Sequence, residues 1–279
     1  MTQVAEPTVR PRVRKKPKAA TPKGLPKWVS GLIGIAVFLG IWELVPALGI
    51  VQAKYLPPAS EVIVALANDL GLTAFWVAVG DTMLAWFLGL LMAVVAALVL
   101  GLVIGMSPFL RRFTNSTIEF LRPIPSVALI PLAVLLFGVK IESSLLLIVY
   151  ACFWQVLIQV LYGVADVDNV AMQTARSYGF SYAQRVRNVV FPTMLPYLMT
   201  GIRLAASVAL ILAITAELII GSDGLGKEIA LAQSGGAISG MYALILATGL
   251  LGVVINGVTR VVEKRVLSWH PSIRGEATA

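Results

Sequence analysis

The sequence predicts an all-α integral membrane protein with six transmembrane helices. Of its 279 residues, 58% are hydrophobic and only 13% are charged, whereas a soluble domain carries about 25% charged residues. Apolar stretches of about 20 residues, the length that crosses a bilayer as a helix, recur along the chain. Lysine and arginine gather in alternate connections between these stretches. These three observations indicate one polytopic membrane domain.

Residues 1–27 form a basic, proline-rich segment ahead of the first apolar stretch. They hold eight Lys or Arg, five prolines and one acidic residue, Glu6. Such a composition cannot bury enough apolar surface to fold, so we expect a disordered tail. A cleaved signal peptide fits less well, because the apolar run that follows is long enough to span the membrane and has no clear small-x-small cleavage site.

Residues 28–266 form the expected membrane domain, with six apolar stretches of span length. The third stretch contains Pro125 and Pro131, which can break a helix and expose backbone groups to a cavity; a simple kink at the helix entry is the alternative. Residues 60–72 have helical periodicity and few charges, and we expect them either on the surface or at the membrane interface. The expected spans are 28–48, 79–104, 123–139, 143–164, 195–220 and 242–262.

The distribution of positive charge orients these spans. With both termini in the cytoplasm, the inner segments hold eighteen Lys or Arg and the outer segments hold three, Lys54, Lys140 and Lys227. This is a strong positive-inside bias, and it accounts for the net charge of +8 without a nucleic-acid partner. It places residues 166–192 in the cytoplasm, between the fourth and fifth spans, and makes 267–279 a cytoplasmic C-terminal tail.

The cytoplasmic segment between the fourth and fifth spans is longer and more polar than a simple connection needs. Asp168 can cap a helix over 170–178, and Gly179 suits the left-handed end of that helix. A second helix over 181–190 would stop before Pro192. We therefore expect a compact projection of two short helices, whose apolar side consists of Val170, Met172 and Ala175.

A motif in this segment resembles the EAA motif of ABC importer permeases, E-A-A-x3-G-x9-I-x-L-P. The spacing matches throughout, with Gln for Glu, Thr for Ala, Val for Ile and Phe for Leu. The resemblance implies a type I ABC importer permease fold, in which this segment is a coupling helix that docks into a groove on a separate ATPase subunit. That partner binds ATP and Mg²⁺, and this chain needs no cofactor. The coupling residues implied are Gln173, Thr174, Ala175, Arg176, Gly179, Val189, Phe191 and Pro192.

A second stretch narrows the resemblance to the nitrate/sulfonate/taurine importer permeases. It reads R-P-I-P from Arg122, I-P-L from Ile130 and F-G from Phe137, and E-L-I from Glu217 and G-L-G from Gly224 also resemble that group. The similarity covers residues 28–271. It implies a bacterial inner-membrane importer of a small anion such as an aliphatic sulfonate, taurine or nitrate. An extracytoplasmic binding protein would deliver the solute, and two permease copies would form the pathway.

Four residues are candidates for the solute pathway: Pro125, Pro131, Arg203 and Glu217. Arg203 lies about 12 Å from the inner end of the fifth span. It can draw anions into the pathway, or it can snorkel to the surface or pair with a carboxylate. Glu217 lies within two turns of the outer face, where interfacial solvation and a contact at the outer gate are both open.

Catalytic and metal chemistry are not indicated. Cys152 and His270 are the only cysteine and histidine, which excludes an internal disulfide and leaves too few ligands for a zinc site. Residues 221–227 match G-x4-G-K, but Glu228 stands where a phosphate-binding loop has Ser or Thr to hold Mg²⁺. The alternative to an ATP-driven permease is a self-sufficient secondary transporter or channel, which would need ion-coupling acids near the bilayer midplane; a membrane scaffold is a third reading.

Overall fold

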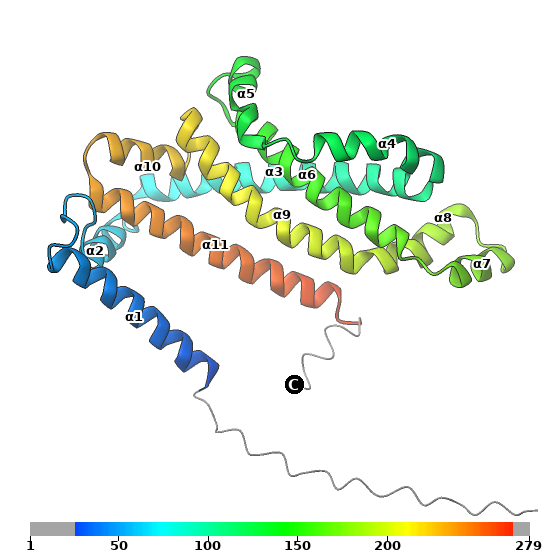
Figure 1. Ribbon diagram of the computed structural model, residues 1–279, viewed down its shortest axis with the longest axis horizontal. Helices are drawn as coiled ribbons and strands as arrows, with labels where there is room; N and C mark the ends of the chain where they lie inside the picture. The colour runs from blue at the N-terminus through cyan, green and yellow to red at the C-terminus, as the bar shows by residue number, and fades with distance from the viewer. Residues whose placement is uncertain (1–25, 270–279) are drawn as a thin grey trace, which may run out of the picture.

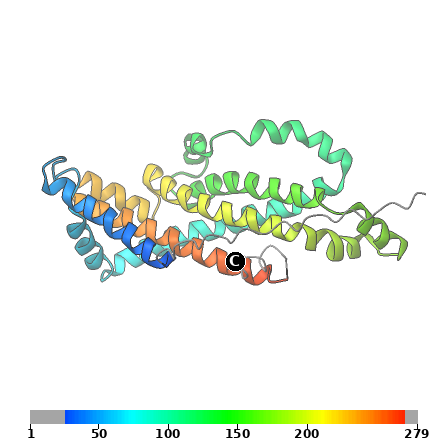
Figure 2. The ribbon, with the colours of Figure 1, turned by 60° about the horizontal axis from the view of Figure 1, so that its bottom comes forward.

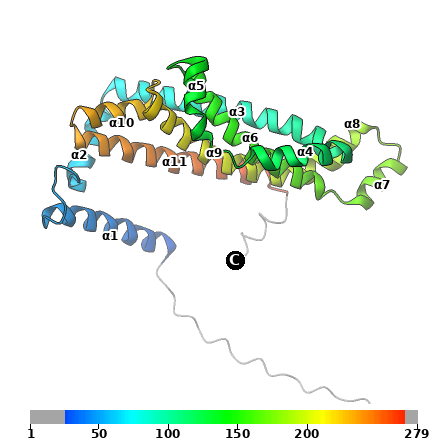
Figure 3. The same ribbon diagram turned by 45° about the horizontal axis from the view of Figure 1, so that its top comes forward.

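The computed structural model describes residues 26–269, and every regular element of that part is a helix. Four long helices lie side by side along the long axis of the molecule, as Figures 1 and 3 show. They are α3 (Thr73–Met106), α6 (Ile141–Ala165), α9 (Phe191–Ile220) and α11 (Ile238–Val266). The basic tail expected over residues 1–25 and the tail expected from residue 270 onward lie outside the described residues.

Short helices occupy the two ends of this bundle. At one end, here called the α7 end, lie α7 (Asn169–Ser177) and α8 (Tyr182–Arg185). At the other, the α10 end, lie α2 (Ala59–Asp69) and α10 (Leu225–Ser234). The segment expected to project from the membrane and α2, which covers most of residues 60–72, are therefore at opposite ends of the spans.

Five helices are long and apolar enough to cross a membrane: α1 (Lys27–Ala47), α3, α6, α11 and a continuous helix, Tyr182–Ile220, that contains α9. A sixth span exists if α4 (Pro108–Leu121) and the helical stretch Ser126–Phe137 are counted together, although they meet at 81°. The chain is thus an all-helical, multi-pass membrane protein. Figure 2 shows α4 running alongside the bundle before the chain turns into α5 (Ile130–Phe137).

The third expected span, 123–139, is interrupted near Pro125 as expected, but its bounds are wrong, because a sixth span would also need α4. Residues Pro123 to Pro125 form a turn, a 3₁₀ helix occupies Ser126–Leu129, and α5 has only 8 residues, about 12 Å of helix. The preceding helix, α4, was not predicted, because its charged residues concealed the helical pattern. It nevertheless has a strong start: the Ser107 hydroxyl accepts from the Leu110 amide at 3.3 Å, and Pro108 lies in the first turn. Arg111 and Arg122 consequently lie at opposite ends of a helix, and not together in one loop.

Glycines bring α3 and α6 into close contact. A Cβ on Gly89 would lie 2.5 Å from Ile148 Cγ2, and one on Gly101 would lie 2.5 Å from Val160 Cγ1. Real Cβ atoms do not approach so closely, so only glycine permits this spacing, as is common between helices in membranes. The third helix of this core, α9, joins through Trp86, whose Nε1 donates to the Ala206 carbonyl at 2.8 Å.

We predict that Gly101→Ala destabilises the protein by about 1–3 kcal/mol, because the added methyl group overpacks the α3–α6 contact. The measurement is thermal unfolding of the purified protein in detergent, followed by tryptophan fluorescence. Gly31→Ala is the matched control, since a Cβ there meets nothing within 4 Å. Equal unfolding temperatures for the two variants would contradict the packing described.

The first span attaches to the rest of the described chain at its C-terminal end. Trp42 Nε1 donates to the Pro57 carbonyl at 3.0 Å. The Glu43 carboxylate accepts from the Ser60 amide at 3.0 Å and from the Ser60 hydroxyl at 2.8 Å. Glu43 therefore fixes the start of α2, whose own N-cap is a proline without a capping side chain. The remaining length of α1 diverges from the bundle in Figures 1 and 3.

Candidate functional site

The helix α7 has well-formed caps at both ends. Asp168 Oδ1 accepts from the Val170 amide at 2.8 Å. At the other end Gly179 has φ +74°, and the amides of Phe180 and Gly179 donate to the carbonyls of Ala175 and Arg176, both at 3.0 Å. This pair of bonds is a Schellman motif, which needs a left-handed residue. The cap and the stop predicted from the sequence are both confirmed, and the helix bounds differ by one residue.

One face of α7 is exposed and partly apolar. Val170 and Tyr178 are 68% and 79% exposed, and Gln173 and Thr174 lie between them on the same side of the helix. The Thr174 hydroxyl is used locally, since it donates to the Val170 carbonyl at 2.8 Å. The three residues of the expected apolar side differ in exposure: Ala175 is buried, Met172 is half-buried and Val170 is exposed. An exposed valine and tyrosine beside polar groups suit a protein-binding surface.

The second short helix does not stop before Pro192. A capping box at Ser181 and Gln184 starts α8, the chain continues through a π-helical turn, Val186–Val190, and α9 begins directly at Phe191. A proline inside a helix clashes with the carbonyl four residues earlier and removes one hydrogen bond. The wider π turn relieves both effects. The prediction of a break at Pro192 is therefore wrong, and α8 is rigidly continuous with the long helix α9.

A hollow of about 300 Å³ separates α7 from the ends of α3 and α6. Arg176 and Arg185 both line it, and the Arg185 guanidinium lies 5.9 Å from the centre of the Tyr182 ring. The Tyr182 hydroxyl contacts Met106 Sδ at 3.3 Å. Arg176, a candidate coupling residue, lines this hollow and is also exposed, one helical turn from Gln173 on α7.

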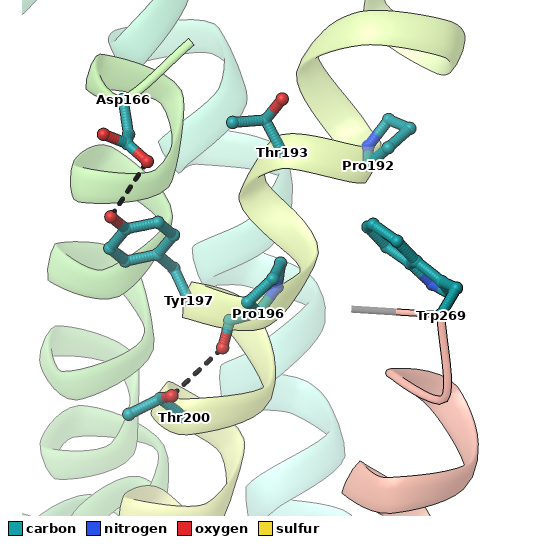
Figure 4. A pocket seen from close by; sticks show the side chains of 7 residues that line it. All are labelled: Asp166, Pro192, Thr193, Pro196, Tyr197, Thr200 and Trp269. Carbon is teal, nitrogen blue, oxygen red and sulfur yellow. Dashed lines mark hydrogen bonds between the residues drawn. The ribbon is translucent and has the colours of Figure 1, made fainter. Parts of the chain in front are cut away.

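A second hollow, of about 460 Å³, lies where the segment 166–192 meets α9. Figure 4 shows the Tyr197 hydroxyl donating to Asp166 Oδ2 at 3.0 Å, beside Pro192 and Thr193. The bond joins the residue that ends α6 to the first turns of α9. It holds the two ends of the segment together. The bond could not be predicted from the sequence, because the partners are 31 positions apart.

Two of the four pathway candidates, Arg203 and Glu217, form hydrogen bonds to other helices, whereas the two prolines act on the backbone. Arg203 Nη1 donates to Glu263 Oε2 of α11 at 3.0 Å, so the pairing left open from the sequence is present. Pro131 lies in the first turn of α5, where no backbone N–H is needed. It therefore starts a helix and does not break one. Pro125 belongs to the turn that separates α4 from α5.

Glu217 connects three elements at the α10 end. Its side chain is 1% exposed, and its Oε2 accepts from the Thr82 hydroxyl of α3 and from the Gly226 amide, both at 2.9 Å. The Thr82 oxygen accepts in turn from the Leu225 amide at 2.9 Å. Gly224, the N-cap of α10, has no side chain to cap the helix. Glu217 and Thr82 perform that capping from the neighbouring helices.

The polar face of α4 points toward α6 and was missed from the sequence as a site. Arg111, Asn115, Ile118 and Arg122 follow the spacing i, i+4, i+7, i+11, which is one face of a helix. They line a hollow of about 460 Å³ against Ile158, Leu161 and Tyr162 of α6. The opposite face carries Phe109, Phe113 and Phe120, each 73% exposed.

Comparison with known proteins places this architecture in a family. Residues 89–268 match the family described as "Binding-protein-dependent transport system inner membrane component". The taurine transport system permease protein TauC of Escherichia coli (strain K12) is 31% identical over 245 residues, 86% of this chain and 89% of that protein. The nitrate import permease protein NrtB of Leptolyngbya laminosa is 25% identical over 268 residues, 92% of this chain and 95% of that protein.

A solved structure shares the fold. It is an inward-facing conformation of the MetNI methionine ABC transporter, with a TM-score of 0.61 and 17% sequence identity over 70% of this chain and 97% of the other. The helical bundle is therefore the fold of a type I ABC importer permease, and ATP hydrolysis belongs to a separate subunit. With the family match over residues 89–268, this shows that the chain is a permease and belongs to the binding-protein-dependent transport system inner membrane components of ABC importers.

Proposed function

We propose that this permease imports a small anion, with taurine and other sulfonates ahead of nitrate, as one of two identical copies. Its α7 end lies in the cytoplasm and docks the ATPase. The observation that carries the docking is the exposed face of α7, on which Val170 and Tyr178 flank Gln173. The names of the relatives TauC and NrtB support the class of solute.

The proposed coupling residues divide into contact residues and shape residues. Gln173 and Thr174 lie on the exposed face and would touch the ATPase. Ala175 is buried and packs α7 against the rest of the segment. Gly179 sets the direction in which the chain leaves the helix. The remaining four line the hollow beside α3 and α6 or lie at the base of α9, and they would transmit the motion: Arg176, Val189, Phe191 and Pro192.

The route for that motion is short and covalently continuous. α8 runs through the π turn into α9 without a break, and the Tyr197–Asp166 hydrogen bond closes the base of the segment. ATP would favour one arrangement of the ATPase pair, and the docked segments would shift the membrane helices with it. Alternating access then needs only rigid-body movement of the helices.

Charge supports the proposed orientation. Many of the basic residues lie toward the α7 end of the long helices: Arg111, Arg112, Arg176, Arg185, Arg187, Arg260, Lys264 and Arg265. The α10 end carries Lys54, Lys140 and Lys227. This asymmetry follows the positive-inside rule, with both termini in the cytoplasm.

A hollow of about 410 Å³ at the α10 end favours taurine over a simple anion. It is lined by Asp81 and Glu142 as well as Lys140, together with Glu217 and the Asp223 that pairs with Lys227. Excess carboxylate attracts an ammonium group and repels a lone anion. Taurine carries an ammonium and a sulfonate, so it suits an entry of this charge better than nitrate does.

The test is uptake by proteoliposomes that contain the permease, its ATPase and its binding protein. Three labelled solutes separate the chemistry: taurine, ethanesulfonate, which lacks the amine, and nitrate. We expect ATP-dependent uptake of taurine to exceed that of ethanesulfonate and nitrate. Uptake driven by an ion gradient in liposomes holding this chain alone would instead support a secondary transporter. ATP-dependent uptake of none of the three would contradict the proposed solute class.

A further inference from the structure

We propose that the hollow between α4 and α6 is the anion-binding part of the solute pathway, and that Arg122 is its main contact with a sulfonate or a similar oxyanion. This deepens the proposed function and rests on it. The hollow measures about 460 Å³, and its polar lining is Arg111, Asn115, Glu119, Arg122 and Tyr162.

The depth of Arg122 is the first argument. The Tyr150 hydroxyl donates to the Leu121 carbonyl at 2.6 Å, which holds the end of α4 at the level of Tyr150. That tyrosine lies about 22 Å from one end of α6 and about 13 Å from the other, and the hydrocarbon core is about 30 Å thick. Arg122 is thus near the middle of the membrane, where an arginine is costly and usually serves a cavity.

The two faces of α4 give the second argument. The face with Arg111 and Arg122 points to α6, while Phe109, Phe113 and Phe120 point away, each 73% exposed. A helix at a water surface would turn its arginines outward and bury its phenylalanines. The observed arrangement fits a helix inside the membrane that borders a polar space on one side and lipid or a second copy on the other.

The available charge is the third argument. Within residues 26–269 the ion pairs are Arg203–Glu263 and Lys227–Asp223, so no carboxylate there lies within 4.0 Å of the Arg111 or Arg122 guanidinium. The one acid in the lining, Glu119, accepts from Asn115 at 2.9 Å. Planar guanidinium groups bind oxyanions with two parallel hydrogen bonds. Arg203, already paired, is a poorer anion site than Arg122.

Thiol labelling tests whether the hollow contains water. Arg122→Cys and Phe120→Cys lie at the same depth on opposite faces of α4, and the native Cys152 is buried. The reagent is 2-sulfonatoethyl methanethiosulfonate, which is anionic and does not enter lipid. In the complete transporter in membranes, we expect Arg122→Cys to react at least tenfold faster than Phe120→Cys. Equal rates, or faster labelling of Phe120→Cys, would overturn the proposal.

Transport of the complete complex tests the anion contact. We expect Arg122→Gln to lower ATP-dependent taurine uptake about tenfold or more, the scale of one charge-assisted hydrogen bond. Arg122→Lys should restore part of the lost uptake. Arg112 also lies on α4 but does not line the hollow, so Arg112→Gln should leave uptake nearly unchanged. Equal losses in Arg112→Gln and Arg122→Gln would also overturn the proposal.

Failure of the proposed function gives a different result. In that case the unsubstituted complex carries none of the three solutes in an ATP-dependent way. The labelling does not depend on transport, so it still decides whether Arg122 faces a polar hollow.

Discussion

A chain with Gly179→Val is expected to insert into the membrane and to lose most of its ATPase during purification. Gly179 has φ +74° and ends α7 in a Schellman motif. A β-branched residue is strongly disfavoured in that region, so the end of α7 and the neighbouring Tyr178 would change position. We expect at least a tenfold weaker association, measured as the amount of ATPase that copurifies with the permease.

The chain offers matched controls for this substitution. Gly49 and Gly236 have φ +71° and +73°, and like Gly179 they have no atom within 4 Å of an added Cβ. The local backbone cost of valine is therefore similar, but both positions lie at the α10 end of the spans. Gly49→Val and Gly236→Val should retain the ATPase. Comparable loss in all three variants would show that general instability, and not docking, causes the effect.

Glu217→Ala should be the most destabilising single substitution at the α10 end, by about 2–4 kcal/mol. The buried carboxylate accepts from Thr82 and from the Gly226 amide, and each buried donor left without a partner costs about 1–3 kcal/mol. The loss also removes carboxylate atoms that pack against Gly224. A lower unfolding temperature of the detergent-solubilised protein would be the readout, with Glu217→Gln less affected because it keeps the volume and one acceptor.

Asp223→Ala is the control for this prediction. Its side chain is 78% exposed and pairs with Lys227 at 2.7 Å across one helical turn, and exposed pairs of this kind contribute little. We therefore expect an unfolding temperature close to that of the unsubstituted protein. If Asp223→Ala is as destabilising as Glu217→Ala, the interhelical capping by Glu217 is not what stabilises this end.

Local chemistry made α7 predictable. An Asp that accepts from an amide two residues later and a Gly at the left-handed stop act within one turn of chain, so Asp168 and Gly179 could be placed from the sequence. The other spans could be predicted because their signal, a long apolar stretch, is also local in the sequence. The exposure of Val170 could not be predicted, because it depends on what the rest of the segment packs against.

The errors of prediction arose at residue types that occur in two different structural roles. Proline ends a helix or occupies its first turn. Pro131 proved to be a first-turn residue, whereas Pro192 lies inside a helix that continues through a π turn. Charged residues in α4 concealed a helix whose polar face points inward. The partners of Glu217 and Tyr197 lie 135 and 31 positions away, a distance over which one sequence carries no pairing signal.

Site-specific crosslinking is the sharpest test of whether the exposed face of α7 binds the ATPase. Gln173→Cys and, as control, Asn188→Cys would carry a thiol-linked benzophenone; the native Cys152 is buried and should not react. Both positions are exposed at the α7 end, but Asn188 lies in the π turn and not on α7. We expect a crosslink to the ATPase from residue 173 and little or none from residue 188. Crosslinking from residue 188 alone, or equally from both, would contradict it.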